Sequence, residues 1–315
     1  FGGINLEDIK APECFIVEQK LRERLKIPVF HDDQHGTAII VGAAIVNALE
    51  IAGKKIEDVK LATTGAGAAG IACLDMLVAL GLKPENILAF DRDGVIHSGR
   101  ADLDPAKARY ARDTTARSLG EIVAGADVFL GLSAGGILKP EMVETMAPNP
   151  VILALANPYP EIMPEDAKRV RPDAIIATGR SDFPNQVNNA VCFPYIFRGA
   201  LDVGATGINE AMKLACVHAI AQLAKEEASD LGSAYGEEIP SFGREYIIPR
   251  PFDPRLLTIV APAVAEAAMA SGIALRPMED MRAYREKLGQ FIHRTGLVMK
   301  PVYDRARADR QRIVY

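Results

Sequence analysis

The sequence has few cysteines, no long run of basic residues and no Cys-x-x-Cys pair. Its four cysteines lie far apart, and most of them stand in apolar, helix-like runs: Cys14, Cys73, Cys192 and Cys216. We therefore expect buried free thiols and a reducing, cytoplasmic location. The net charge is −5 with 24% charged residues, which argues against a nucleic-acid partner or an anionic membrane surface.

Long apolar runs are also missing. Residues 37–49 are too few to cross a bilayer, and glycines interrupt the next apolar run. The first residues carry no initiator methionine and no signal-peptide pattern, and they look like the middle of a longer protein. No internal repeat occurs, and no Ser-His-Asp or Cys-His arrangement can be assigned. With 315 residues, 49% of them hydrophobic, the chain has enough apolar residues for a large core and more than one unit.

A predicted strand, a glycine turn and a predicted helix follow one another from Val59 to Leu80. The turn has the pattern Gly-x-Gly-x-x-Gly and consists of Gly65, Ala66, Gly67, Ala68, Ala69 and Gly70. In this context the pattern predicts a dinucleotide-binding site. The first glycine makes the tight turn, the second admits the pyrophosphate, and the third allows close packing of helix on strand. The N–H groups and the dipole of the helix start favour phosphate. The alternative is a Gly/Ala-rich turn of any α/β protein.

An acidic residue stands where such a site needs one. The next predicted strand, residues 86–91, ends in Asp91, 21 positions after Gly70. An acid at this place typically meets the adenine ribose. Asp91 favours a free ribose hydroxyl and therefore NAD, whereas Arg92, Arg100 and Lys107 favour a phosphate and therefore NADP. The residues leave this choice open.

Further strands are predicted at residues 126–131, 151–158 and 174–179, alternating with helices. This alternation is typical of an α/β fold with a doubly wound, Rossmann-like parallel sheet. From residue 206 on, the pattern predicts a helical C-terminal region. It includes a helix over residues 253–271, kinked at Pro262, and another over residues 278–288. Ligands of such sheets bind beyond the carboxyl ends of the strands. That rule selects Gly65–Gly70, Asp91, Ser133–Gly136, Asn157 and the residues after Gly179.

Ahead of the glycine motif the chain carries several acids. We expect a helix over residues 13–25, a strand over residues 28–31 and a helix over residues 37–46 that is buried on most sides. Glu7, Asp8 and Asp33 offer three oxygen ligands to one divalent cation, Mg²⁺ or Mn²⁺. The alternative for Glu7 and Asp8 is a solvated or helix-capping pair. Asp32 and Asp33 end a strand beside an apolar helix, where they need compensating charge.

Two other groups of polar residues stand near predicted strand ends. His31 and His35 flank the aspartate pair, and we interpret them as supporting or turn residues rather than ligands. Asn185, Gln186, Asn188 and Asn189 lie within five residues of one another. Such neutral donors and acceptors suit a carboxamide or a small carboxylate. The alternative is an asparagine-rich turn that caps a helix over residues 190–197.

Five motifs in this order resemble the malic enzymes, most closely the bacterial NADP-dependent type. They are Asn5–Asp8, Phe30–Ala38, the glycine motif, Ala156–Pro158 and Asn185–Asn189. The resemblance covers nearly the whole chain and implies oxidative decarboxylation of malate to pyruvate and CO₂ with reduction of NADP or NAD. It makes Glu7, Asp8 and Asp33 the metal ligands. It gives Gly65–Gly70 and Asp91 to the adenine side of the cofactor, and Asn157, Asn188 and Asn189 to the nicotinamide and the substrate.

The resemblance also implies an order of domains. Residues 1–36 would end an N-terminal malic domain, residues 37–290 would form the NAD(P)-binding domain with its C-terminal helices, and residues 291–315 would lead to a phosphotransacetylase-like domain. The general-acid tyrosine and the general-base lysine are expected before residue 1, so no catalytic residue is assigned within the chain. A homo-oligomer is expected. Malolactic enzyme, which shares these motifs, and a cofactor-binding fragment without turnover are the alternatives.

Overall fold

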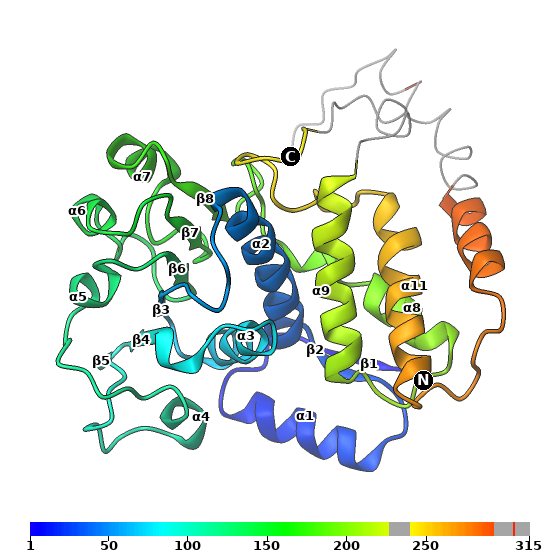
Figure 1. Cartoon of the computed structure of the whole chain (residues 1–315). Helices are drawn as coiled ribbons and strands as arrows, with labels where there is room; N and C mark the ends of the chain where they lie inside the picture. The colour runs from blue at the N-terminus through cyan, green and yellow to red at the C-terminus, as the bar shows by residue number, and fades with distance from the viewer. Residues whose placement is uncertain (227–239, 293–304, 306–315) are drawn as a thin grey trace.

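The computed structural model describes residues 1–226, 240–292 and 305. Its centre is a six-stranded sheet of order β5-β4-β3-β6-β7-β8 (Figure 1). The strands are β3 (Leu61–Thr64), β4 (Ile87–Asp91), β5 (Gly94–Val95), β6 (Val128–Gly131), β7 (Val151–Ala154) and β8 (Ile175–Thr178). All neighbours pair in parallel except β5, which pairs antiparallel with β4. The predicted Rossmann-like sheet is confirmed. Its antiparallel edge strand β5 lies within residues 92–102, a polar, irregular run whose sequence predicts a loop.

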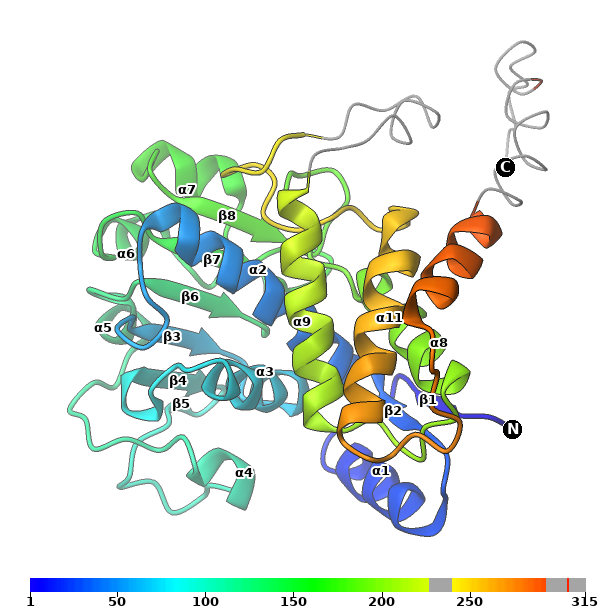
Figure 2. The same cartoon turned by 45° about the vertical axis from the view of Figure 1, so that its right-hand side comes forward.

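Helices cover both faces of this sheet (Figures 1 and 2). One face carries α5 (Leu119–Val123), α6 (Pro140–Glu144) and α7 (Pro164–Val170), and the other carries α2 (Thr37–Ala52) and α3 (Ala68–Ala79). The apolar side chains accordingly form two cores, one on each side. Every residue of β6, β7 and β8 is buried, as a parallel sheet covered on both faces requires.

A further layer of helices packs against α2. It consists of α8 (Tyr195–Asp202), α9 (Glu210–Lys225) and α11 (Arg255–Ala270), and residues 281–292 form another helical stretch. α9 packs on α2, and α11 packs on α8 and α9. The predicted helical C-terminal region therefore exists and shares one core with the sheet. The polar, glycine-containing sequence of residues 229–243 predicts a loop, and most of it lies outside the described residues. The same is true of the segment expected over residues 291–315.

The chain before α2 forms a small separate sheet. β1 (Ile4–Leu6) and β2 (Val29–His31) pair in parallel, and α1 (Glu13–Arg24) connects them. Between β2 and α2, a single π-helical turn, η1 (Asp32–Gly36), continues directly into the helix, where we expected the chain to turn. Together η1 and α2 span 21 residues and are long and apolar enough to cross a membrane, so the expectation from residues 37–49 is wrong on length. Since 67% of its apolar 18-residue stretch is buried inside the protein, this helix serves here as a core helix.

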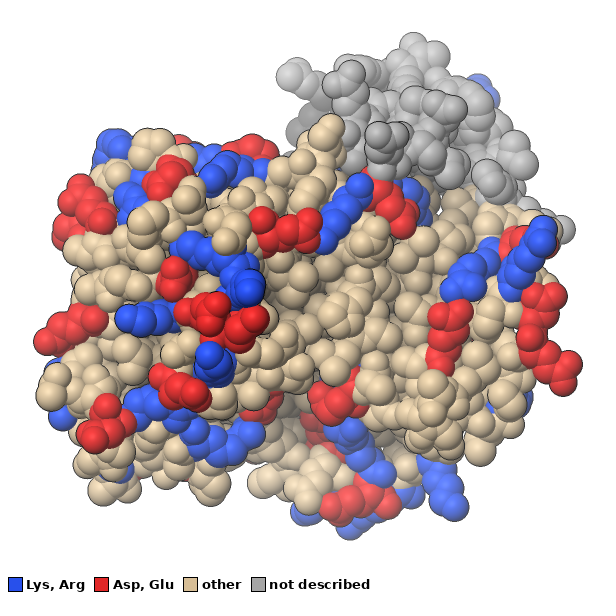
Figure 3. Space-filling view, in the orientation of Figure 1, with Lys and Arg blue, Asp and Glu red and all other residues tan. Residues whose placement is uncertain are grey.

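Charge is mixed on the surface, and sulfur is buried inside. Figure 3 shows acidic and basic side chains interspersed on one face, and the sequence as a whole has 36 basic and 41 acidic residues. The four cysteines are free and buried, as predicted. Their burial agrees with their positions in apolar runs of the sequence.

Candidate cofactor and metal site

The glycine turn between β3 and α3 has the geometry that its spacing predicts. Gly65 has a φ of +91°, and a Cβ atom on it would stand 2.2 Å from the carbonyl oxygen of Leu132. A Cβ atom on Gly70 would stand 1.8 Å from the carbonyl oxygen of Gly65. Gly67 faces open space and precedes α3 without a side-chain cap. The first N–H groups of α3 therefore point to where an anion can bind.

A cavity of about 1150 Å³ opens in front of this turn. It lies where the strand order reverses, beyond the carboxyl ends of β3 and β6, which is the place where this fold binds dinucleotides. Its walls come from the glycine turn, the end of β4, the segment after β6 and helix α1. The structure thus brings together three of the predicted segments: Gly65–Gly70, Asp91 and Ser133–Gly136.

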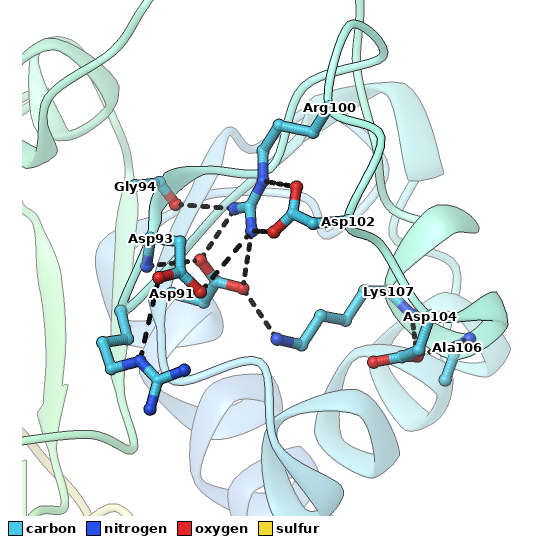
Figure 4. Close-up of polar contacts among 9 residues, drawn as sticks. Asp91, Asp93, Gly94, Arg100, Asp102, Asp104, Ala106 and Lys107 are labelled. Carbon is cyan, nitrogen blue, oxygen red and sulfur yellow. Dashed lines mark hydrogen bonds and ion pairs between the residues drawn. The ribbon is translucent and has the colours of Figure 1, made fainter.

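Asp91, at the end of β4, is paired through both of its oxygens (Figure 4). Oδ1 accepts from Arg100 Nη1 at 2.7 Å and from the N–H of Asp93 at 3.0 Å. Oδ2 accepts from Lys107 Nζ at 2.7 Å. Burial opposes ionisation, but the hydrogen bonds from Arg100 and Lys107 outweigh it, so the pKa of Asp91 lies below its ordinary value. The carboxylate that we expected to meet a ribose hydroxyl is already held by two cations.

The side chains of Arg100 and Lys107 differ in exposure and in the number of partners that hold them. The side chain of Arg100 is 8% exposed and also binds Asp102, whereas that of Lys107 is 26% exposed. Lys107 belongs to α4 (Pro105–Ala108), a short helix that the sequence did not reveal, and Asp104 caps it. Lys107 and Arg92 both line the cavity. The positive charge at the Asp91 end of the cavity therefore comes chiefly from the segment between β4 and α5.

The acids predicted to hold a metal are brought together only in part. The N–H of Asp8 donates to Asp33 Oδ2 at 2.8 Å, which places the end of β1 beside η1. Glu7 accepts a hydrogen bond from Asn5. Within residues 1–226, 240–292 and 305, no group of three His, Cys, Asp or Glu side chains stands in an arrangement that could hold a metal ion. The ligand set Glu7, Asp8 and Asp33 stays a prediction.

η1 carries Asp32 and Asp33 next to each other, and we call this segment the acidic loop. Asp32 Oδ2 accepts from Asn189 Nδ2 at 3.3 Å, and the buried Oδ1 of Asp32 has no partner in the described part of the chain. Burial raises the pKa of Asp32 to about 6, the hydrogen bond from Asn189 acts against this rise, and the charges of Glu7 and Asp33 add to it. The charges of Glu7 and Asp33 thus act on Asp32, and a bound divalent cation would relieve this repulsion.

A buried chain of polar groups supports η1 from behind. His35 Nε2 lies 2.9 Å from Glu18 Oε1, and Lys213 Nζ lies 3.1 Å from His35 Nδ1. An ammonium group can only donate, so His35 accepts at Nδ1 and donates from Nε2 to Glu18. Burial lowers the pKa of His35, in keeping with a neutral ring. His35 therefore connects η1 to α1 and α9, which is a supporting position. Sequence reasoning missed Glu18 and Lys213, because they are connected only through His35, and Lys213 lies 178 residues away from it.

The amides after β8 have different roles. Asn185 is buried and donates to two backbone carbonyl groups, so it holds a loop rather than a ligand. Asn188 accepts from the N–H of Ala190 and thereby caps the 3₁₀ turn η3 (Asn189–Val191). The sequence alternative, a capped helix over residues 190–197, is wrong on bounds, because α8 begins only at Tyr195. Asn189 reaches across to the acidic loop and donates to Asp32. Of these three asparagines, Asn189 is the one that connects the segment after β8 to the acidic loop.

Asn157 lies after β7 and lines a second cavity of about 540 Å³. Its side chain lies against Gly179 after β8, where a Cβ atom would stand 3.3 Å from Asn157 Nδ2. The carboxyl ends of β7 and β8 thus meet at the predicted place. Glu161, which sequence reasoning missed, is fully buried beside this cavity. A proline-rich segment precedes Glu161, and its sequence indicates only a surface loop.

The parallel sheet, the glycine turn and the cavity at the point where strand order reverses define a Rossmann-type dinucleotide-binding domain. The family model described as the malic enzyme NAD-binding domain matches residues 34–238. The chain belongs to the malic enzyme family.

Individual relatives agree with this membership. Over its whole length the chain is 62% identical to an NADP-dependent malic enzyme of Haemophilus influenzae and 59% identical to an NAD-dependent malic enzyme of Rhizobium meliloti. It spans 42% and 41% of the lengths of these two proteins. The solved malic enzyme from Pyrococcus horikoshii has a TM-score of 0.83 and 40% identity, with 98% of this chain and 70% of that one covered.

Proposed function

We propose that this chain supplies the cofactor and metal side of an NADP-dependent malic enzyme that works in the cytoplasm as a homo-oligomer. The contact between Asn189 and Asp32 is the observation that supports this function best. It connects the amide segment, which suits carboxylate and carboxamide groups, to the acidic loop. That loop packs against α3, whose start forms the glycine turn. The amide segment, the acidic loop and the helix that follows the glycine turn are therefore neighbours in the fold.

The proposed reaction converts malate and NADP⁺ into pyruvate, CO₂ and NADPH. The nicotinamide supplies the acceptor for the hydride from C2 of malate. Glu7, Asp8 and Asp33 would hold Mg²⁺ or Mn²⁺, which supplies Lewis-acid chemistry at the C2 oxygen. Asn157, Asn188 and Asn189 would orient the substrate carboxylate and the carboxamide of the cofactor. The buried carboxyl of Asp32 would hold Asn189 in place for this role.

Proton transfer is proposed to need groups outside this chain, since the resemblance places the tyrosine and the lysine before residue 1. Positioned proton transfer is worth about 10²–10⁴-fold. We expect the chain alone to bind NADP⁺ but to form NADPH from malate far more slowly than a longer protein that begins well before Phe1, assayed with Mg²⁺ or Mn²⁺.

In that longer protein, Asp33→Asn should abolish metal-dependent turnover, and the exposed control Asp58→Asn should leave it unchanged. Equal rates for chain and longer protein would contradict the proposal. Lactate in place of pyruvate would favour the malolactic alternative.

We also propose NADP rather than NAD as the preferred cofactor. Arg100 and Lys107 occupy both oxygens of Asp91, so this carboxylate is poorly placed to accept the 2′-hydroxyl of a ribose. Arg100 is held by Asp102 as well and keeps Asp91 neutralised. Lys107 lines the cavity and can turn from Asp91 to a 2′-phosphate, with which it would form a charge-assisted hydrogen bond.

Replacing Lys107 by glutamine tests this preference. Lys107→Gln keeps much of the length of the side chain but removes its charge, so the affinity for NADP⁺ should fall about tenfold or more, while that for NAD⁺ changes little. Calorimetric titration of both cofactors measures the two effects. Lys83→Gln, at an exposed lysine beside Asp58, is the control. Equal losses for NADP⁺ and NAD⁺ would contradict a phosphate contact at Lys107.

A further inference from the structure

Glu161 is a fully buried carboxylic acid in the segment between β7 and α7. Its Oε1 accepts from the N–H of Ser133 at 2.9 Å, and its Oε2 accepts from the N–H of Ala156 at 3.1 Å. Its backbone carbonyl accepts from the N–H of Leu138 at 3.0 Å. A single residue therefore binds the segment after β6 to the segment after β7.

The end of β6 is shaped to admit this carboxyl group. A Cβ atom on Gly131 would stand 2.3 Å from Glu161 Cδ, so only glycine leaves room at this position. Burial raises the pKa of Glu161, and the N–H groups of Ser133 and Ala156 act against the rise. Both oxygens accept peptide N–H groups, which is the arrangement that a carboxylate, and not a protonated acid, satisfies fully.

The two segments that Glu161 joins both reach the candidate site. Ser133 lines the large cavity in front of the glycine turn, and Ala156 directly precedes Asn157. In the sheet order β4-β3-β6-β7, the adenine side of a dinucleotide lies toward the end of β4, where Asp91 stands. The ends of β6 and β7 therefore lie on the nicotinamide side of the crevice.

We propose that Glu161 is a positioning residue for the nicotinamide half of the cofactor. Its carboxylate fixes the segments that carry Ser133 and Asn157 at one distance from each other, and it acts through them without touching the cofactor. The inference rests on the proposed function, because it assumes that the crevice holds a dinucleotide. It goes beyond that function in assigning a role to a residue that lies behind the site.

The test compares the affinity for the whole cofactor with the affinity for its adenosine half. Glu161→Gln keeps the shape of the side chain but points an N–H₂ group at a peptide N–H. NADP⁺ affinity, measured by calorimetry, should fall about tenfold or more, while affinity for 2′,5′-ADP, which lacks the nicotinamide half, should stay within about twofold. The matched control is Asp173→Asn. The Asp173 carboxylate also accepts a loop N–H, that of Asn149 at 2.7 Å, but at the amino end of the sheet, so this change should lower thermal stability without altering either affinity.

Amide hydrogen exchange gives a second measurement that needs no cofactor. Glu161→Gln should speed exchange at residues 132–138 and 155–162 and leave residues 65–70 unchanged. Equal losses of NADP⁺ and 2′,5′-ADP affinity, or unchanged exchange in both segments, would overturn the positioning role. If the unaltered chain bound neither NADP⁺ nor NAD⁺, the proposed function itself would fail, and the inference with it.

Discussion

At the scale of single residues, the glycine turn separates steric need from functional need. Gly65 and Gly70 each stand where a Cβ atom would collide with a backbone carbonyl, so side chains there would displace the turn. Gly67 has a φ of −83°, which any residue adopts, and open space beside it. The fold does not require a glycine at Gly67. The proposed cofactor site would give a reason for it, because a pyrophosphate at the start of α3 would need this room.

Gly67→Asp should therefore abolish dinucleotide binding and leave the protein folded. A carboxylate at this position would occupy the phosphate site and would itself benefit from the N–H groups at the start of the helix. Cofactor titration together with thermal unfolding tests this expectation. Gly65→Asp is the contrasting variant, because its backbone conformation and the contact with Leu132 should make it lose stability as well. Unchanged cofactor affinity in Gly67→Asp would show that phosphates do not bind at this turn.

Sequence reasoning placed individual residues on strands and turns better than it found their partners. Spacing placed Asp91 at the end of a strand, since strand, turn and acid follow a local pattern. It treated Arg100 and Lys107 only as partners of a phosphate and missed that both bind Asp91, because both stand in an irregular segment without periodicity. Asn185 was grouped with ligand-binding amides, although its side chain donates to backbone carbonyls inside the protein. Such choices depend on contacts across the fold, which composition and spacing do not encode.

At the scale of elements, the buried strands were predictable because four-residue apolar runs must be covered on both sides. The turn η1 was not, because its five residues are polar and a π-helical turn has no distinct sequence pattern. The continuation of η1 into α2 decides where its polar side chains lie. By continuing into α2, η1 places Asp32 under Asn189 and His35 against Glu18. The acidic loop is thus held by a core helix rather than by a free turn.

The turns at the amino ends of β7 and β8 allow a test of pH dependence. Asp173 accepts from Arg171 and from the N–H of Asn149. The Arg171 guanidinium chiefly lowers the pKa of this carboxyl below its ordinary value of 3.8, burial acts against the shift, and the Asn149 N–H adds to it. A lowered folded-state pKa means that the stabilisation is complete above 3.8 and is lost as the pH falls toward the folded value.

Asp173→Asn should accordingly destabilise the protein by about 1–2 kcal/mol at pH 7. The difference in melting temperature from the unaltered chain should narrow as the pH falls below 3.8. Thermal unfolding followed by circular dichroism between pH 3 and pH 7 measures it. A difference that stayed constant over this range would mean that the charge of Asp173 contributes nothing to stability.

At the scale of the whole molecule, the sheet and the C-terminal helices behave as one body. The larger core runs from β3, β6 and β7 through α2 to α9 and α11 without a break. The sequence predicted both regions but not that they share one core, because the apolar stripes of α2 and α9 do not show that these two helices pack on each other. Asn47, fully buried in α2, marks this shared core. Its Nδ2 donates to the carbonyl of Ala221 in α9 at 2.9 Å and to that of Ile247 at 2.8 Å.

Asn47→Ala should therefore weaken the molecule as a whole. The change leaves two buried carbonyl groups without this donor and opens space between α2 and α9, which should cost about 1–3 kcal/mol. For a chain of this size each kcal/mol corresponds to a fall of about 2–4 °C in the melting temperature. Asn86→Ala is the control, because Asn86 makes a 3.4 Å bond at the surface and should change stability by less than about 0.5 kcal/mol. Calorimetry should show one transition shifted as a unit. A split into two transitions, with only one of them lowered, would mean that the sheet and the helical layer unfold separately and that Asn47 does not join them into one core.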